Sequence, residues 1–235
     1  MQRYSKVLGK NEREMVMIKG FPCKWGRCTF CDYIHDNSEN EKEIIKFNKE
    51  ILEDITGEFG VLDVINSGSI FEVPKENLYD IKKIIDEKNI KKIFVECHWI
   101  YKNRLQEIRD IFGIEVIFRC GIETFENDFR MNFFNKGANF KDYSEVNKYF
   151  DSICLLVGVK GQTKEMIDRD IKILEKEFKL GCVNVYVENS TNLKRDEELI
   201  KWFEKKYEYL RDNPNIEGLF HNTDLGVGSE EDERK

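Results

Sequence analysis

The sequence predicts an α/β fold, a partial (β/α)6 TIM-like barrel in which a splayed parallel sheet has its helices outside. Short apolar runs alternate with longer stretches whose apolar residues recur three and four positions apart, the pattern typical of successive βα units. The chain has 235 residues, whereas a complete eight-fold barrel typically needs about 250. Six units therefore match the length better than a closed barrel.

Six segments are predicted strands because each is a short apolar run bounded by polar or turn residues. They span residues 15–22, 61–67, 92–97, 115–121, 153–159 and 183–188. In parallel βα folds the functional side chains follow the carboxyl ends of the strands. We therefore expect the site in the loops after these six segments.

The stretches between the strands are predicted helices, and several carry recognisable ends. Pro74 stands at a helix start, where its missing N–H costs least, and Gly113 is a plausible stop. Thr163 is expected to cap a helix that closes on Gly181. The helical stretches span residues 40–55, 74–89, 101–113, 163–181 and 196–212.

Composition narrows the class of protein. The formal net charge of −7 disfavours a long nucleic acid as partner, because phosphate binding needs a basic face. No apolar run approaches the roughly 20 residues of a membrane helix, and the N-terminus lacks a signal-peptide core. The seven cysteines show no secreted disulfide framework, so a reducing cytoplasm is expected.

No segment rich in Pro, Gly or Ser divides the chain, so residues 1–235 are expected to form one domain. Residues 1–14 form an N-terminal extension in this interpretation. Residues 212–235 form a C-terminal segment that could fold back over the barrel mouth and that ends in an acidic tail.

The stretch GFPCKWGRCTFCDY places Cys23, Cys28 and Cys31 directly after the first predicted strand. A structural zinc site needs four ligands, and His35 is a candidate fourth. A redox C-x-x-C pair of Cys28 and Cys31 would leave Cys23 unexplained. Three thiolates can also hold a [4Fe–4S] cluster with one iron left open for a substrate or cofactor. We favour this third interpretation.

The C-x4-C-x2-C loop resembles the cluster loop of the radical S-adenosylmethionine (SAM) superfamily, with one residue more in the first gap than the usual spacing. The aromatic Phe30 before the last cysteine matches the same pattern. The resemblance implies that Cys23, Cys28 and Cys31 ligate the cluster and are the catalytic centre. It also implies that Phe30 packs near the adenine of SAM.

Motifs at the other strand ends fall in the order that the superfamily uses. Residues 66–69 read NSGS, a small polar turn where family members hold the amino-acid end of SAM. Glu96 and His98 follow the third strand. Glu123 lies in GIET, which resembles the family's G-L-E-T segment, and NKG at residues 135–137 extends that match. The implied cofactor-binding residues beyond Phe30 are Asn66, Ser67, Gly68, Ser69, Glu96 and Glu123.

The resemblance implies radical chemistry on a small molecule. One electron from the cluster cleaves SAM to methionine and a 5′-deoxyadenosyl radical, which abstracts hydrogen from a substrate C–H bond; the protein positions atoms and excludes solvent. An electron donor such as flavodoxin or ferredoxin is an expected partner. The remaining cysteines, Cys97, Cys120, Cys154 and Cys182, lie singly on predicted strands, so we expect small buried apolar residues and no second cluster.

At a closer level the loop and the length resemble the small radical SAM lyases of queuosine salvage. These enzymes release queuine from queuosine or its 5′-phosphate by breaking the glycosidic bond, a lyase reaction. The base and its cationic amine need acceptors. Trp25 and Tyr33 on the cysteine loop are candidates to border the substrate pocket, and His221 and Asn222 are further polar candidates near the C-terminus. The predicted substrate-binding residues are His98, Glu188, Asn189, Asn192 and Asp224.

Three alternatives stay open at this point. A 7-deazaguanine synthase type would remodel a pterin with SAM and magnesium. An activating enzyme would install a glycyl radical on a partner protein, although such enzymes usually have the three-residue first gap. A non-enzymatic zinc or iron–sulfur module would bind metal without cleaving SAM.

Overall fold

The computed structural model describes residues 2–221 and 224–227. The chain divides into two compact units. Of the described residues, the first unit comprises residues 2–26, 33–118 and 225–227, and the second comprises residues 27–32, 119–221 and 224. The C-x4-C-x2-C loop is therefore shared, with Cys23 in the first unit and the other two cysteines in the second.

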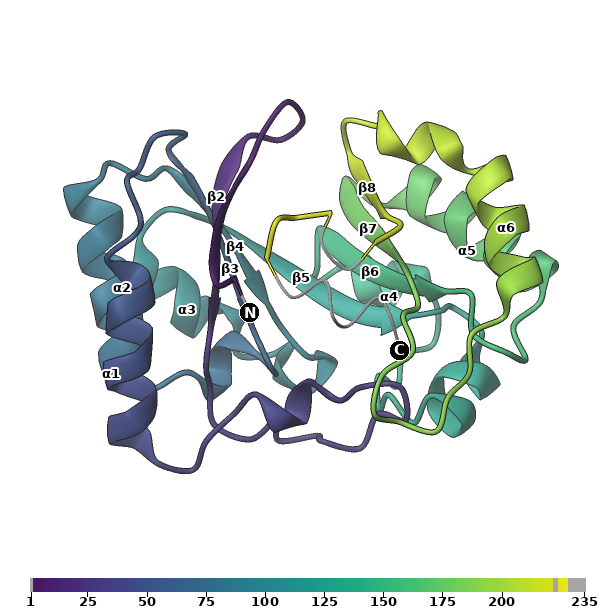
Figure 1. Cartoon of the computed structure of the whole chain (residues 1–235), viewed down its shortest axis with the longest axis horizontal. Helices are drawn as coiled ribbons and strands as arrows, with labels where there is room; N and C mark the ends of the chain where they lie inside the picture. Colours follow the sequence, from purple (N-terminus) through teal and green to yellow (C-terminus); the bar gives the residue numbers. More distant parts are fainter. Residues whose placement is uncertain (1, 222–223, 228–235) are drawn as a thin grey trace. The chain divides into compact units, whose positions relative to one another are not determined.

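The first unit is built on four strands in chain order, β1-β2-β3-β4 (Figure 1). β1 pairs antiparallel with β2, and the pairs β2–β3 and β3–β4 are parallel. The strands are β1 (Tyr4–Val7), β2 (Arg13–Ile18), β3 (Val61–Asn66) and β4 (Lys92–Glu96). The helices are α1 (Glu41–Leu52), α2 (Lys75–Glu87) and α3 (Leu105–Phe112), with 3-10 turns η1 (Tyr33–His35), η2 (Ile70–Glu72) and η3 (Trp99–Tyr101).

The second unit continues with β5-β6-β7-β8, all paired in parallel. Its strands are β5 (Glu115–Glu123), whose first four residues belong to the first unit, β6 (Ser152–Val157), β7 (Leu180–Val185) and β8 (Ile216–Leu219). Its helices are the π-helix η4 (Phe129–Phe133), α4 (Tyr143–Asn147), α5 (Lys164–Glu177) and α6 (Glu197–Lys206), followed by the 3-10 turn η5 (Glu208–Arg211).

The predicted fold class, an α/β fold with the parallel βα order of a partial barrel, is confirmed. All six predicted strands and all five predicted helices are present. The sequence did not predict β1, β8, α4 or the π-helix. Each of these elements has only four or five residues, too few to show a period. β1 lies inside the segment 1–14 that was expected to precede the sheet.

Three of the predicted helix ends are confirmed and one is wrong. Pro74 caps α2, Thr163 caps α5 through its side chain, and Gly113 ends α3 with a φ of 66°. Gly181 does not end a helix, because α5 stops at Glu177 and Gly181 is the second residue of β7. An added Cβ there would lie 2.5 Å from Leu174 of α5, so this glycine serves helix-to-sheet packing.

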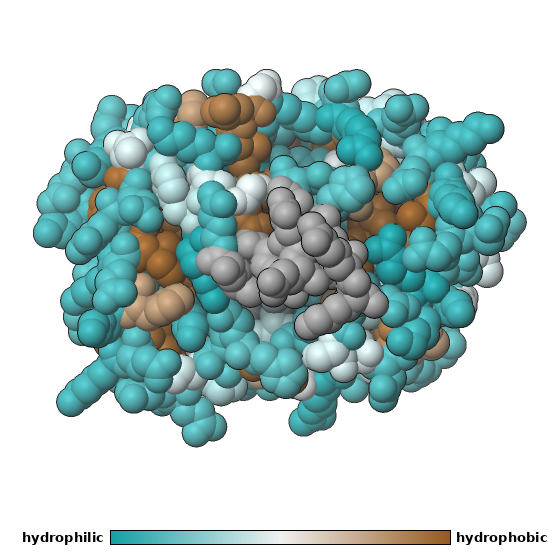
Figure 2. All heavy atoms as spheres, in the orientation of Figure 1, coloured by the Kyte–Doolittle hydropathy of each residue, from teal (hydrophilic) through white to brown (hydrophobic). Residues whose placement is uncertain are grey.

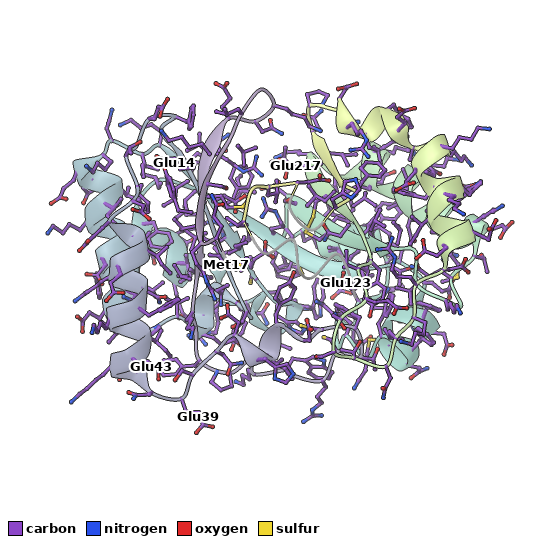
Figure 3. The ribbon with its side chains drawn as sticks, viewed as in Figure 1. Glu14, Met17, Glu39, Glu43, Glu123 and Glu217 are labelled. Carbon is purple, nitrogen blue, oxygen red and sulfur yellow. A yellow bond between two sulfur atoms is a disulfide. The ribbon has the colours of Figure 1, made fainter. Side chains whose placement is uncertain are left out.

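The two faces of β7 and β8 differ in what covers them. On one face, Gly181 leaves room for Leu174 of α5, and Gly218 leaves room for Leu210 of η5. Because successive side chains alternate between faces, Asn184 and Glu217 lie on the face away from these helices. Glu217 is labelled on β8 in Figure 3.

Cys154 and Cys182 correct one expectation. They were predicted to be separate buried residues, but they face each other in register on β6 and β7 and form a disulfide. Their Cα atoms are 4.7 Å apart, within the range that a disulfide spans. Cys97 and Cys120 lie outside any disulfide and are buried, as expected.

The surfaces over α1 and α6 are mostly hydrophilic (Figure 2). Within residues 2–221 and 224–227, no helix is long and apolar enough to cross a membrane.

Candidate cofactor site

The first half of the cysteine loop is anchored by Glu72. Its carboxylate oxygen Oε1 accepts a hydrogen bond from the backbone N–H of Lys24 at 2.9 Å, and its carbonyl oxygen accepts one from Phe21 N–H at 2.7 Å. Both bonds lie within two residues of Cys23. Glu72 is only 5% exposed, and burial raises the pKa of its carboxyl group.

The NSGS turn after β3 lies directly against Cys23. An added Cβ on Gly68 would lie 3.3 Å from the Cys23 Cβ and 2.5 Å from Glu72 Oε2. A contact as short as the second would force the Glu72 carboxylate to shift, so glycine lets the turn approach this carboxylate without displacing it. Ser69 then caps η2 in a reciprocal capping box with Glu72. The turn predicted to hold SAM is thereby fixed beside the first cysteine.

Two buried polar atoms of this turn have no hydrogen-bond partner among the residues that the structure describes. They are Asn66 Oδ1 and Ser67 Oγ. Buried polar groups are nearly always paired, so an unpaired pair in one turn calls for an explanation. A ligand with N–H donors, such as an α-ammonium group, would satisfy both atoms. This is the observation on which the turn fits the amino-acid end of SAM.

We expect the variant Ser67→Ala to separate ligand binding from stability. The hydroxyl is buried and unpaired, so its removal should leave the ligand-free protein as stable as before, or slightly more stable. SAM affinity should fall about two- to tenfold, the worth of one hydrogen bond of about 0.5–1.5 kcal/mol. Calorimetric titration and thermal unfolding measure the two effects. Unchanged affinity would show that Ser67 does not contact the ligand.

The second half of the loop, Arg27–Asp32, is anchored by the segment that follows the π-helix. Thr29 donates through its N–H to the Phe134 carbonyl at 3.0 Å and through its hydroxyl to the Phe133 carbonyl at 2.8 Å. Asn135 donates through Nδ2 to the Arg27 carbonyl at 3.0 Å. π-Helices often occur at functional sites, and here the π-helix turns these carbonyls toward the loop.

Asn189, in the segment after β7, also anchors the second half of the cysteine loop. Its Nδ2 donates to the Phe30 carbonyl at 2.8 Å, and the N–H of Ser190 donates to the Asp32 carboxylate at 3.1 Å. The Phe30 ring packs edge-on against Phe134, with ring centroids 5.2 Å apart. Asn189 was predicted to bind substrate, and in this structure its amide N–H positions the residue before the third cysteine.

Glu123 and Lys136 form a buried ion pair near Phe30 of the cysteine loop. The Lys136 Nζ lies 2.8 Å from Glu123 Oε1, and the two side chains are 12% and 7% exposed. Burial alone would lower the pKa of Lys136, but the negative charge of Glu123 outweighs burial and raises this pKa. The ammonium also lies 5.4 Å from the centre of the Phe30 ring, within cation–π range. Lys136 therefore joins the GIET and NKG motifs to Phe30.

Glu123 adopts a left-handed backbone with a φ of 68°, which is uncommon for a residue other than glycine. Its neighbour Thr124 is fixed by Asp170, which accepts from the Thr124 hydroxyl at 2.5 Å and from Phe125 N–H at 3.1 Å. The buried Arg130 guanidinium donates to the Thr124 carbonyl at 2.9 Å. These bonds hold the turn that carries Glu123 at the end of β5 (Figure 3). Burial raises the pKa of Asp170 to about 6.

The predicted residues after β4 lie in the first unit. His98 is 6% exposed, stacks on Trp25 with ring centroids 6.0 Å apart, and accepts a hydrogen bond from Ile100 N–H at 3.3 Å. Its ring therefore supports the cysteine loop and caps η3. Glu96 is half-buried at the end of β4, and Tyr33 is exposed on η1.

The other predicted substrate residues mostly close their own loops. Glu188 accepts from Arg195 N–H at 3.1 Å and from Lys194 Nζ at 3.4 Å. Asp224 accepts from the N–H groups of Phe220 and His221 at 2.7 and 2.9 Å. Asn192 is exposed. Asn222 and the acidic tail lie outside the residues that the structure describes.

Glu72 and Lys136 contribute to this site and were not predicted from the sequence. Ser69 and Glu72 have the spacing of a capping box, a signal that was readable in SIFE. Lys136 was visible as the middle residue of NKG, but its pairing with Glu123 depends on the fold. Asn184 and Glu217, on the face away from α5, had no motif to mark them.

The chemistry of the three loop cysteines fits an iron–sulfur cluster. Cys23, Cys28 and Cys31 all lie outside any disulfide and are half-buried, whereas Cys97 and Cys120 are buried. Burial raises the pKa of the Cys97 thiol to about 12, which disfavours the thiolate that binds iron. Within the described residues, no three or more His, Cys, Asp or Glu side chains are gathered as a ready metal site. The ligand assignment rests on spacing, thiols outside any disulfide and the neighbouring turn.

A comparison with solved structures finds a match over nearly the whole chain. A solved queuine lyase from Clostridium spiroforme, bound to SAM and queuine, is 51% identical to this chain. The match covers 97% of this chain and 100% of that one, with a TM-score of 0.95. No family profile matches the chain.

More distant matches show the fold alone. SuiB from Streptococcus suis, solved with S-adenosylmethionine bound, is 14% identical over 87% of this chain and 46% of that one, with a TM-score of 0.51. Methylornithine synthase is 16% identical over 91% of this chain and 74% of that one, with a TM-score of 0.52.

A curated relative, an uncharacterized protein of Methanocaldococcus jannaschii, is 28% identical over 207 residues. The match covers 76% of this chain, and the chain spans about half (55%) of that relative's length. The Clostridium spiroforme enzyme, by contrast, is matched over its whole length at 51% identity. On that match the chain belongs to the queuine lyase family of the radical SAM superfamily.

Proposed function

We propose that this protein is a radical SAM lyase that breaks the glycosidic bond of queuosine or its 5′-phosphate and releases queuine. The observation that carries the proposal is the 51% identity over the full length of a queuine lyase bound to SAM and queuine. The geometry supports it, because a turn with two unpaired buried polar atoms lies against the first cysteine of the loop.

In this proposal Cys23, Cys28 and Cys31 hold a [4Fe–4S] cluster. When bound, the cluster and SAM supply a one-electron cleavage that yields a hydrogen-abstracting radical. The protein's own residues then bind and orient. Asn66 Oδ1 and Ser67 Oγ accept from the amino-acid end of SAM, and Gly68 lets the turn approach the cysteine.

Further cofactor contacts remain part of the proposal. The Phe30 ring, held by Asn189 and Phe134, offers an apolar surface for the adenine. Ser69, Glu96 and Glu123 complete the predicted set. Glu123 is paired with Lys136, which balances its charge and fixes its position. We propose that it serves as a hydrogen-bond acceptor for SAM.

For the substrate, the sequence favoured polar residues of the loops after β7 and β8. Because Glu188 and Asp224 close their own loops, we propose Asn184 and Glu217 as additional acceptors. Both are half-buried on the face of β7 and β8 away from the helices, and a carboxylate suits the cationic amine of the substrate. His98, Asn189 and Asn192 stay in the proposed set.

The proposed setting is a reducing cytoplasm with a flavodoxin or ferredoxin as electron donor. This setting is proposed because thiolate ligands must stay reduced to hold iron. The lack of a disulfide framework in the sequence no longer supports this setting, because Cys154 and Cys182 form a disulfide. In the C-terminal segment, the Leu225 carbonyl accepts a hydrogen bond from the Ser5 hydroxyl of β1 at 2.6 Å.

Product analysis tests this function. The protein is reconstituted anaerobically with iron and sulfide, reduced with dithionite, and incubated with SAM and either queuosine or its 5′-phosphate. Mass spectrometry should find free queuine and 5′-deoxyadenosine. A parallel reaction offers a reduced pterin with magnesium, the substrate of the rival 7-deazaguanine synthase type. A ring-contracted product there, with queuosine intact, would overturn the lyase proposal.

A further inference from the structure

We propose that Glu72 is a positioning residue that ties the first cluster cysteine to the SAM turn. The inference deepens the proposed function and rests on it. No sequence motif of the family marked this residue, and its assignment comes from the hydrogen bonds that its carboxylate makes in the first unit.

The carboxylate of Glu72 joins three segments that are far apart in sequence. Oε1 accepts from Lys24 N–H in the cysteine loop and from the Tyr101 hydroxyl after β4, each at 2.9 Å. Oε2 accepts from Ser69 N–H in the NSGS turn at 2.5 Å. One side chain thus fixes three loops that each follow a different strand.

The position of these bonds links them to the cofactor. Lys24 is adjacent to Cys23, and Ser69 ends the turn that carries Asn66 Oδ1 and Ser67 Oγ, the two unpaired buried atoms. A shift of Glu72 would move the cysteine and the turn relative to each other. Positioning within a fraction of an ångström governs such sites, so we expect an effect on SAM binding.

The variant Glu72→Gln tests this arrangement with little change in volume. An amide keeps one acceptor oxygen but presents N–H donors on its other side. Whichever way the amide turns, it faces at least one donor N–H of Lys24 or Ser69. We expect the SAM dissociation constant to rise roughly 10- to 100-fold, the scale for lost bonds to a charged group.

Glu14 is a matched control in the same unit. It is fully buried and accepts from the Tyr4 hydroxyl at 2.8 Å and from the backbone N–H groups of Thr56 and Gly57 at 2.7 and 2.6 Å. It also accepts from the Thr56 hydroxyl at 3.0 Å. Like Glu72, it joins a tyrosine hydroxyl to two backbone N–H groups, but it lies near the start of β2 (Figure 3), at the opposite end of the strand from Cys23. Glu14→Gln should therefore destabilise the fold similarly without weakening SAM binding.

The experiment compares wild type, Glu72→Gln and Glu14→Gln after anaerobic reconstitution. It measures iron per chain, the SAM dissociation constant, the change that SAM causes in the EPR spectrum of the reduced cluster, and the melting temperature. We expect Glu72→Gln to weaken SAM binding and alter the EPR change, and Glu14→Gln to lower only the melting temperature. Tyr101→Phe, which keeps the carboxylate, is the second variant should Glu72→Gln fail to fold, and it should weaken SAM binding more mildly.

Two results would overturn the positioning role. One is wild-type SAM affinity and EPR behaviour in Glu72→Gln or, if that variant does not fold, in Tyr101→Phe. The other is equal losses in Glu72→Gln and Glu14→Gln, which would show a general effect on stability. A wild-type protein that forms no cluster would instead contradict the proposed function.

Discussion

Replacing any one of Cys23, Cys28 and Cys31 by alanine should abolish the cluster and the cleavage of SAM. Each thiolate supplies one of only three protein ligands in the proposed site, so none can be spared. Iron and sulfide analysis, visible absorbance and 5′-deoxyadenosine formation after anaerobic reconstitution measure the loss. We expect essentially no cluster in any of the three variants, with melting temperatures close to that of the unreconstituted wild type.

The double variant Cys154→Ala/Cys182→Ala is the control for this series. It removes two cysteines that pair with each other on β6 and β7, and it leaves the loop intact. Iron content in this variant should match that of the wild type. A normal cluster in the Cys23, Cys28 or Cys31 variant would contradict the three-thiolate site.

Replacing Lys136 by methionine should cost about 3–5 kcal/mol in the free energy of unfolding, the range seen when one partner of a buried ion pair is removed. The reason is that the Glu123 carboxylate, 7% exposed, would lose the ammonium that lies 2.8 Å away. Urea unfolding monitored by circular dichroism measures the change. Because Lys136 also lies near Phe30, cluster retention should fall in parallel.

The double variant Glu123→Gln/Lys136→Met distinguishes the loss of charge pairing from the loss of packing. With both charges removed, no uncompensated carboxylate is buried, and most of the lost stability should return. A double variant as unstable as the sum of the two single variants would show that the pair does not act as a unit.

The sequence contained most of the fold because its signals are local. Alternation of apolar runs with helical periods located six strands and five helices, and caps such as Thr163 and Gly113 marked their ends. Gly181 misled the prediction because its role depends on Leu174 of α5. The Cys154–Cys182 disulfide likewise depends on the register of β6 and β7, which sequence spacing does not encode.

The site residues with local sequence signals were likewise predictable, and those whose role depends on the fold were not. Cysteine spacing and the NSGS turn were readable as chemistry at strand ends, and the turn does lie against Cys23. Loop side chains were harder to interpret, because a polar residue in a loop can serve either a ligand or its own backbone. Asn189 holds the Phe30 carbonyl and Asp224 closes a turn; only the folded chain distinguishes these uses from substrate binding.

Full turnover of queuosine under anaerobic conditions tests the central claim most directly. Reconstituted protein, dithionite and SAM are mixed with queuosine in one reaction and with its 5′-phosphate in another, and queuine and 5′-deoxyadenosine are quantified over time by mass spectrometry. A reaction with the Cys28→Ala variant gives the background. We predict that queuine appears only with the intact loop and SAM, together with 5′-deoxyadenosine. If 5′-deoxyadenosine forms while queuosine and its 5′-phosphate both remain intact, the assigned substrate is wrong.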